Sequence, residues 1–190
     1  MRLFLAIDFE PAAREGLAAV QTALRTATGA GANDLRWTDP GTLHLTLHFL
    51  GEVDAAGLER LRTSLGDALP DRPFTLRTGA PGCFPARGPV RVIWLGMAEG
   101  GPETTAIHGE LAARIRRAGL VVEPRPLTPH LTLARARDPR RSARDLRDRV
   151  AACHAPVIAS RVDRVVLYES DLSGPRPRYT ALATLALAGA

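Results

Sequence analysis

The chain of 190 residues contains no lysine, so all 25 of its basic residues are arginine. Against 20 acidic residues they give a formal net charge of +5. A basic surface favours polyanionic partners such as nucleic acid, through counterion release and electrostatic steering. A solvated arginine-rich surface would give the same balance, so charge alone leaves both interpretations open.

Cysteines and long apolar runs are also scarce. The two cysteines, Cys83 and Cys153, form no CxxC or metal-binding spacing, which favours a reduced cytoplasmic protein. The first residues, RLFLAIDF, are interrupted by Asp8 and Glu10 too early for a signal peptide. No apolar run approaches the roughly 18 residues that a membrane span needs. We therefore expect a cytoplasmic protein with no membrane partner.

Length and composition predict one folded domain over residues 1–190. Hydrophobic residues make up 45% of the chain and charged residues 24%, as is ordinary for a globular protein. A chain of this length can bury a core without disulfides or a structural metal.

One four-residue motif, HLTL, occurs twice, at His44–Leu47 and His130–Leu133. Leucine and threonine are acceptable strand formers, and polar and apolar residues alternate with the period of a half-buried strand. In such a strand the leucines face the core and the polar residues face away from it. The polar residues of the two copies are His44, Thr46, His130 and Thr132.

Hydrophobic periodicity predicts an α+β fold in which strands and helices alternate. Helices are predicted over 12–28, 55–69, 104–118 and 142–153, the last with Ser142 as N-cap. Strands are predicted over 2–9, 35–37, 43–50, 74–78, 90–95, 121–123, 129–134, 157–168 and 179–187, with a loop over 79–89. The repeated motif predicts two pseudo-symmetric lobes, with mostly antiparallel sheets flanked by helices and an active site in the cleft between them. The segment 96–102 is the best candidate for a boundary between the lobes.

Two histidines and two threonines suit the hydrolysis of a cyclic phosphodiester without a metal or other cofactor. One imidazole can take a proton from water while the other, protonated, gives one to the leaving oxygen. Threonine hydroxyls can donate hydrogen bonds to the non-bridging oxygens. Arg135 follows the second motif closely enough to contact the phosphate. Strict alternation turns it to the opposite face, however, so this role requires a bulge or a strand end.

Metal binding and base stacking are the other roles that these residue types suggest. His44 and His48 are four residues apart, as in the zinc motif HExxH, but that spacing requires a helix and the glutamate is absent. No metal site is therefore predicted. His48 is either a substrate contact in the cleft or an exposed polar position. Phe49 could stack on a base, although it shares the face of Leu45 and Leu47, which favours core packing.

The remaining histidines and both tryptophans lie in no repeated motif. His108 and His154 fall in helical patterns and are predicted at the surface. Trp37 and Trp94 are predicted in the core.

At the HLTL motifs the chain resembles the two-histidine (2H) phosphoesterases, which carry two H-x-T/S-x motifs in pseudo-symmetric lobes. Within them it is similar to the bacterial RNA 2',3'-cyclic phosphodiesterase (2'-5' RNA ligase) family. The resemblance covers nearly the whole chain, in the segments RLFLAIDF, RWTDP, LHLTLHFLG, PVRVIWLG, PHLTLAR and LYES. It implies metal-independent hydrolysis of 2',3'-cyclic phosphate RNA ends to 2'-phosphates. The reverse reaction would join ends in a 2'-5' linkage.

The resemblance also implies a role for each motif residue. His44 is the proton donor to the leaving 3'-oxygen, and His130 is the base that activates water. Thr46 and Thr132 bind the phosphate, with Arg135 assisting. Residues and spacing alone do not decide which histidine does which.

The chain departs from the family pattern at His48, where relatives commonly carry Lys or Arg, and at Leu127, where an aromatic is common. These departures leave the substrate preference open. RNA with 2',3'-cyclic phosphate ends, tRNA fragments included, is the expected substrate. The alternatives are a small cyclic nucleotide, such as an ADP-ribose cyclic phosphate, and a non-catalytic RNA-binding module. No apolar surface stripe is left over after the core is assigned, so a monomer is expected.

Overall fold

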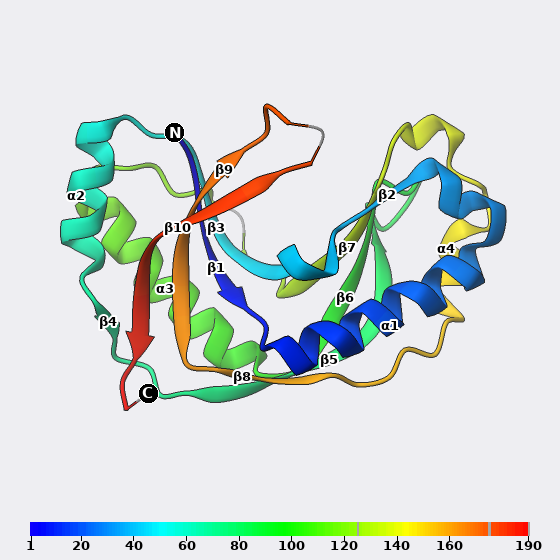
Figure 1. The fold of residues 1–190 in the computed structure, drawn as a ribbon, viewed down its shortest axis with the longest axis horizontal. Coiled ribbons are helices and arrows are strands. Elements are labelled where there is room, and N and C mark those ends of the chain that lie inside the picture. Colours follow the sequence, from blue (N-terminus) through cyan, green and yellow to red (C-terminus); the bar gives the residue numbers. More distant parts are fainter. Residues whose placement is uncertain (125, 175, 190) are drawn as a thin grey trace.

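Two five-stranded sheets form the framework of the computed structural model, which describes residues 1–124, 126–174 and 176–189 (Figure 1). The first sheet has the order β3 (His44–Glu52), β1 (Arg2–Asp8), β9 (Arg164–Asp171), β10 (Arg178–Leu187) and β4 (Ala68–Leu69). The second sheet has the order β2 (Leu35–Trp37), β7 (His130–Ala136), β6 (Val92–Glu99), β5 (Phe74–Phe84) and β8 (Ala159–Val162). All neighbouring strands are antiparallel except β10 and β4. The predicted α+β class is confirmed.

Helices cover one face of each sheet (Figure 1). The first sheet carries α2 (Ala55–Leu65) and α3 (Gly101–Arg117), and the second carries α1 (Pro11–Thr28) and α4 (Leu146–Ala151). Three short 3-10 helices, η1 (Gly29–Asp34), η2 (Pro40–Thr42) and η3 (Pro139–Arg141), lie in connections. We call each sheet with its helices a lobe. Within the described ranges, no helix is long and apolar enough to cross a membrane.

Simple periodicities explain how these layers pack. In β1, Leu3, Leu5 and Ile7 are fully buried in the core, as the period-2 pattern of a strand requires. In α1, Leu17 and Leu24 are seven residues apart, about two helical turns, and share one buried stripe. Side chains of both lobes belong to one continuous buried cluster.

The two lobes are interleaved along the chain. β1 and β3 lie in the first sheet, whereas β2, which comes between them in sequence, lies in the second. The chain then returns to the second sheet for β5 to β8 and ends in the first with β9 and β10. The segment predicted as the boundary, 96–102, does lead from the second lobe (β6) to the first (α3), but it is one of several crossings and separates no sequential halves.

Helix boundaries differ from the prediction where a cap or a strand intervenes. The helix predicted over 55–69 ends at Leu65, because Gly66 adopts a positive φ of 62°. Residues after it form the short strand β4. The helix predicted from Ser142 begins at Leu146, with Asp145 at its N-cap. The predicted strand over 121–123 is absent.

Strand boundaries differ chiefly where bulges are present. The predicted loop over 79–89 is mostly strand, because β5 continues to Phe84. Its register against β6 shifts between Thr78 and Pro81, and such a bulge accommodates glycine and proline within a strand. The strand predicted over 157–168 is two strands, since the chain passes from the second sheet to the first at Asp163.

Candidate active site between the two sheets

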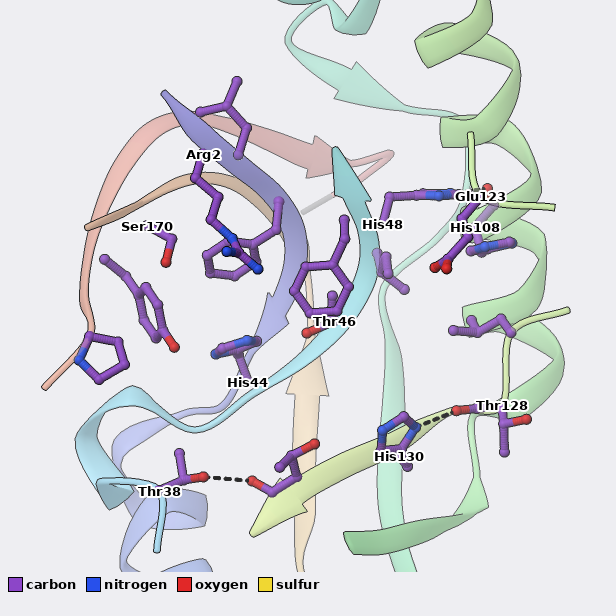
Figure 2. Close-up of a pocket in the computed structure, with 18 of the residues that line it drawn as sticks. Arg2, Thr38, His44, Thr46, His48, His108, Glu123, Thr128, His130 and Ser170 are labelled. Carbon is purple, nitrogen blue, oxygen red and sulfur yellow. Dashed lines mark hydrogen bonds between the residues drawn. The ribbon is translucent and has the colours of Figure 1, made fainter. Parts of the chain in front are cut away.

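A cavity of about 970 Å³ lies between the two sheets, and both motif strands line it (Figure 2). It is lined by residues of β1, β3 and β10 on one side and of β5 and β7 on the other. All seven residues predicted for the site line this cavity: His44, Thr46, His48, Phe49, His130, Thr132 and Arg135. The cavity thus lies where the site is predicted, between the lobes.

A β-bulge in β3 decides which side chains of the first motif reach the cavity. The register of β3 against β1 shifts between Thr46 and His48, so that Leu47 and His48 are both buried. Alternation then resumes in the opposite phase, and Phe49 is 52% exposed and lines the cavity. The prediction that Phe49 packs in the core with Leu47 is therefore wrong.

The second motif has a bulge at the equivalent place. The register of β7 against β6 shifts by one residue at Leu133, and Leu133 and Ala134 are both buried. The next residue, Arg135, is turned to the cavity, which His130 and Thr132 also line. This is the bulge that a phosphate contact by Arg135 requires.

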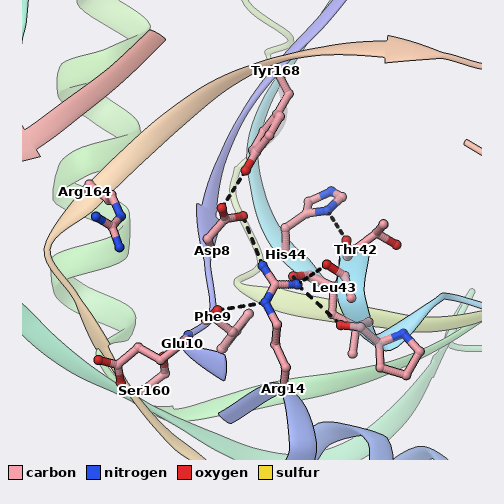
Figure 3. Close-up of polar contacts among 12 residues, drawn as sticks. Asp8, Phe9, Glu10, Arg14, Thr42, Leu43, His44, Ser160, Arg164 and Tyr168 are labelled. Atoms are coloured by element: carbon pink, nitrogen blue, oxygen red, sulfur yellow. Dashed lines mark hydrogen bonds and ion pairs between the residues drawn. The ribbon is translucent and has the colours of Figure 1, made fainter. Parts of the chain in front are cut away.

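Each motif histidine is oriented by a carbonyl two residues before it. His44 Nδ1 lies 2.8 Å from the carbonyl oxygen of Thr42 (Figure 3), and His130 Nδ1 lies 2.7 Å from that of Thr128 (Figure 2). A carbonyl oxygen only accepts hydrogen bonds, so Nδ1 donates in both histidines. Nε2 of each ring is then the atom left to give or take a proton.

The surroundings of His44 change its protonation equilibrium. Burial lowers the pKa of His44, and the hydrogen bond to the Thr42 carbonyl and the negative charge of Asp8 oppose this effect. The positive charges of Arg14 and Arg135 add to the lowering of the pKa. The protonated ring of His44 therefore releases its proton more readily than an exposed imidazolium does.

Aromatic rings that the sequence did not indicate surround the two histidines. Phe4 and Tyr179 lie beside His44, at ring-centroid distances of 4.9 and 5.3 Å. On the opposite wall His130 contacts Phe84 at 5.1 Å. Of these rings, only Phe4 could have been placed from the sequence. It lies two residues after Arg2 in the first predicted strand, and therefore on the same face of that strand as Arg2.

Trp94 supports the wall around His130. Its ring centroid lies 5.0 Å from that of Phe84 and 6.3 Å from that of His130. A Cβ at Gly82 would overlap the Trp94 ring, so only glycine leaves room for it there. The prediction of Trp94 as a core residue is wrong, whereas Trp37 packs against the core as predicted.

His48 and His108 form a stacked pair at one end of the cavity (Figure 2). Their ring centroids are 4.0 Å apart, and His48 Nε2 lies 2.9 Å from the backbone carbonyl oxygen of His108. His48 is only 5% exposed, which excludes the exposed position, one of the two alternatives for it. The prediction of His108 at the surface is wrong, because His108 is half-buried. Burial lowers the pKa of both imidazoles. His154 is exposed, as predicted.

Arg14 of α1 fixes the segment that leads into the first motif (Figure 3). Its guanidinium donates hydrogen bonds to the carbonyl oxygens of Phe9, Gly41 and Leu43, at 2.9, 2.6 and 3.1 Å. It also lies 3.7 Å from the carboxylate of Asp8, which is opposite His44 in the β1–β3 register. His44 thus emerges from a backbone held by a single cation.

Gln21 of the same helix fixes the second motif. It is 2% exposed, and its side-chain amide donates to the carbonyl oxygens of Thr38, at 2.8 Å, and Leu133, at 3.1 Å. Leu133 is the extra residue of the β7 bulge. Arg14 and Gln21 are seven residues apart, about two helical turns, so one side of α1 reaches both motif strands.

The described part of the chain brings together no group of three or more histidine, cysteine or acidic side chains that could hold a metal.

The arrangement of the site and the comparison with known proteins agree on the class of this protein. Two H-x-T-x histidines on antiparallel sheets that face one cavity are the arrangement of the two-histidine phosphoesterases. The chain belongs to the 2'-5' RNA ligase superfamily, whose family model matches residues 39–174.

Relatives extend this match to the full chain. The RNA 2',3'-cyclic phosphodiesterase of Escherichia coli is 32% identical, over 98% of this chain and 96% of its own. That of Methanothermobacter thermautotrophicus is 30% identical, over 98% and 99%. The crystal structure of E. coli LigT with 3'-AMP matches with a TM-score of 0.75, at 30% identity and 98% of both chains. LigT has also been crystallised with NADP+, and that structure matches with a TM-score of 0.71, at 31% identity over 98% of this chain and 96% of its own.

Proposed function

We propose that the protein is an RNA 2',3'-cyclic phosphodiesterase that opens cyclic phosphate ends to 2'-phosphomonoesters by metal-independent acid–base catalysis. The observation that carries the proposal is the symmetry of the cavity. From opposite walls, each motif presents an imidazole whose Nδ1 is occupied by a backbone carbonyl, together with a threonine. The names of the relatives support the same reaction.

In this mechanism His130 Nε2 takes a proton from water as the water oxygen bonds to phosphorus. The bond from phosphorus to the 3'-oxygen breaks, and His44 Nε2 gives its proton to that oxygen. The product carries a 2'-phosphate and a 3'-hydroxyl. The catalytic cycle leaves His130 protonated and His44 neutral, and proton exchange with solvent restores the starting state.

The phosphate lies between the two threonines. Thr46 and Thr132 donate hydrogen bonds to its non-bridging oxygens, and Arg135 adds a charge-assisted contact from the cavity face of β7. Donors placed in advance around the developing charge stabilise the transition state most effectively when little water is present. The bulge in β7 supports this role, because it turns Arg135 to the cavity.

Phe49 is the base contact in this proposal. Its ring is half exposed in the cavity next to Phe4, at a centroid distance of 6.2 Å, and base–aromatic stacking is tolerant of sequence. His48 forms part of the wall instead, because a backbone carbonyl already occupies its Nε2. Ligand contact by His48 would have to use Nδ1.

RNA ends are the substrates we infer, with tRNA fragments among them, and reversible 2'-5' ligation is the reverse reaction of the same site. We also infer a monomer in the cytoplasm. The relative LigT has been crystallised in complexes with 3'-AMP and with NADP+. Because of these nucleotide complexes of a relative, a small nucleotide remains the alternative substrate.

The test is the rate of opening of a nucleoside 2',3'-cyclic phosphate across pH, with EDTA present. The proposal expects a metal-independent, bell-shaped profile and a 2'-phosphate product. A requirement for metal, or a 3'-phosphate product, would contradict the mechanism. A rate that does not rise from a mononucleotide to an oligonucleotide would favour the small-nucleotide alternative.

A further inference from the structure

Arg2 is a cation in the cavity that the proposed chemistry does not use. It is the first residue of β1, where Leu3 and Leu5 are buried in the core and Arg2 and Phe4 take the other face. Figure 2 shows its side chain extending back along the cavity, in the direction of Thr46 and His44. Its guanidinium is therefore turned into the cavity.

Within the ranges that the structure describes, Arg2 has no acidic partner that would neutralise its charge. The residue opposite it in the β1–β3 register is Glu52, and the carboxylate of Glu52 pairs with the N-terminal ammonium at 3.3 Å. Among the described residues, neither Arg2 nor Arg135 takes part in an ion pair. Burial raises the pKa of the Tyr179 hydroxyl, and the charges of Arg135 and Arg2 both oppose this rise, which places both cations near that ring.

Two cations, Arg2 and Arg135, line the same cavity. Arg135 follows the second motif and belongs with the reacting phosphate. Arg2 lies farther along β1, four residues from the position opposite Thr46, which is about 13 Å along a strand. Phe49, opposite Phe4 in the register, lies between these two positions. A nucleoside stacked on Phe49 would therefore separate the reacting phosphate from Arg2.

We propose that Arg2 forms a second phosphate subsite, which binds the phosphate on the 5'-oxygen of the nucleoside whose 2',3'-cyclic phosphate is opened. The proposal rests on the proposed function for the direction of the substrate. A guanidinium suits this task because it binds two oxygens of one phosphate at once. A phosphate on the 5'-oxygen occurs both as the internucleotide phosphate of an RNA chain and as the 5'-phosphate of a small nucleotide.

The experiment compares three substrates: a nucleoside 2',3'-cyclic phosphate, its 5'-phosphorylated form, and a dinucleotide with the same cyclic end. We expect the native protein to prefer the 5'-phosphorylated form to the plain nucleoside by about tenfold or more in kcat/KM, the effect of one charge-assisted contact. Arg2→Gln abolishes the preference and leaves the rate with the plain nucleoside unchanged. Arg164→Gln is the matched control, because it removes an exposed arginine of the same sheet that does not line the cavity.

The dinucleotide distinguishes the two sources of the phosphate. A preference for the dinucleotide that depends on Arg2 identifies an RNA chain as the ligand, whereas a preference confined to the 5'-phosphorylated nucleoside identifies a small nucleotide. Equal losses with all three substrates in Arg2→Gln would overturn the subsite, because they would show a structural role. A preference that survives Arg2→Gln would overturn it as well.

Binding without turnover separates this inference from the proposed function. Calorimetry with adenosine 2'-monophosphate and adenosine 2',5'-bisphosphate should show tighter binding of the bisphosphate, by about tenfold, in the native protein but not in Arg2→Gln. If this difference is found in a protein that opens no cyclic phosphate, the subsite stands and the proposed activity fails. If cyclic phosphates are opened but the two ligands bind equally, the activity stands and the subsite fails.

Discussion

The two motif strands have the same backbone but different surroundings. In β3 and β7 alike, the histidine and threonine face the cavity, and two adjacent buried residues mark a bulge. The residue that the bulge turns to the cavity is Phe49 in β3 and Arg135 in β7. The repeated strand thus supplies a common position, and the side chain placed there gives one wall an aromatic surface and the other a cation.

The supports of the two strands differ as well. The backbone before His44 is held by the charged side chain of Arg14, and Asp8 lies opposite His44 in the strand register. The bulge before Arg135 is held by the neutral, buried amide of Gln21. A symmetric pair of imidazoles therefore lies in an asymmetric electrostatic environment, which an acid and a base require.

The largest expected effect comes from removing either member of the pair. His44→Ala and His130→Ala should each lower kcat by about 10²- to 10⁴-fold, the usual contribution of a general acid or base. The decrease in kcat of the double variant should be much smaller than the product of the two single decreases, because the two groups act as a unit. Steady-state rates with a nucleoside 2',3'-cyclic phosphate measure this, with His154→Ala, an exposed histidine, as control. Activity that survives either single change would disprove the pairing.

The next largest effects are expected at Arg135 and Phe49, the two residues that follow the bulges, and they should differ in kind. Arg135→Gln should lower kcat/KM by about ten- to a hundredfold, because a charge-assisted phosphate contact is lost. Phe49→Ala should raise KM about tenfold and change kcat little, because a stacking platform binds the ground state and transition state alike. Equal patterns of kcat and KM in the two variants would show that the walls do not differ in the way proposed.

These two residues also show where sequence reasoning succeeded and where it could not. Alternation correctly predicted that His44 and Thr46 face the cavity and that Leu45 is buried, because period 2 is a local property of a strand. It misplaced Phe49, because nothing in the residue pattern marks a bulge. Arg135 was placed correctly only on the condition that a bulge exists. The bulged residue Leu133 accepts a hydrogen bond from Gln21, 112 residues away in sequence, and such a tertiary contact cannot be seen in the local residue pattern.

The aromatic rings around the histidines were missed for a related reason. Phe4, Phe84 and Tyr179 come from three strands that are distant in sequence, and only sheet order brings them together. The interleaving of the lobes was missed likewise. A repeated motif favours two sequential halves, but the crossing of the chain between sheets is fixed by how α1 and β2 pack on the second sheet.

Removing the support of β7 should have a moderate effect on both stability and activity. Gln21→Met keeps much of the volume of the side chain but removes the side-chain amide that donates to the carbonyl oxygens of Thr38 and Leu133. The Leu133 carbonyl oxygen keeps a second donor, the backbone N–H of Thr38, at 2.9 Å. We expect a loss of about 1–3 kcal/mol in the free energy of unfolding, measured in urea. We also expect a decrease in kcat/KM that is largely absent when Arg135→Gln is already present, because both changes act through the bulge. Full additivity of the two changes would contradict that coupling.

The smallest effect concerns Asp8, and it decides which histidine is the acid. Asp8→Asn removes a negative charge that opposes the lowering of the His44 pKa, so the pKa of His44 falls further. If His44 must be protonated, kcat/KM falls at the alkaline end of the profile, where its protonated fraction decreases, and is unchanged at the acid end, where it stays protonated. If His44 were the base, the same change would instead raise kcat/KM at the acid end and leave the alkaline end unaltered. Tyr168→Phe is the control, because it removes the 2.5 Å hydrogen bond to Asp8 but keeps the charge of the carboxylate.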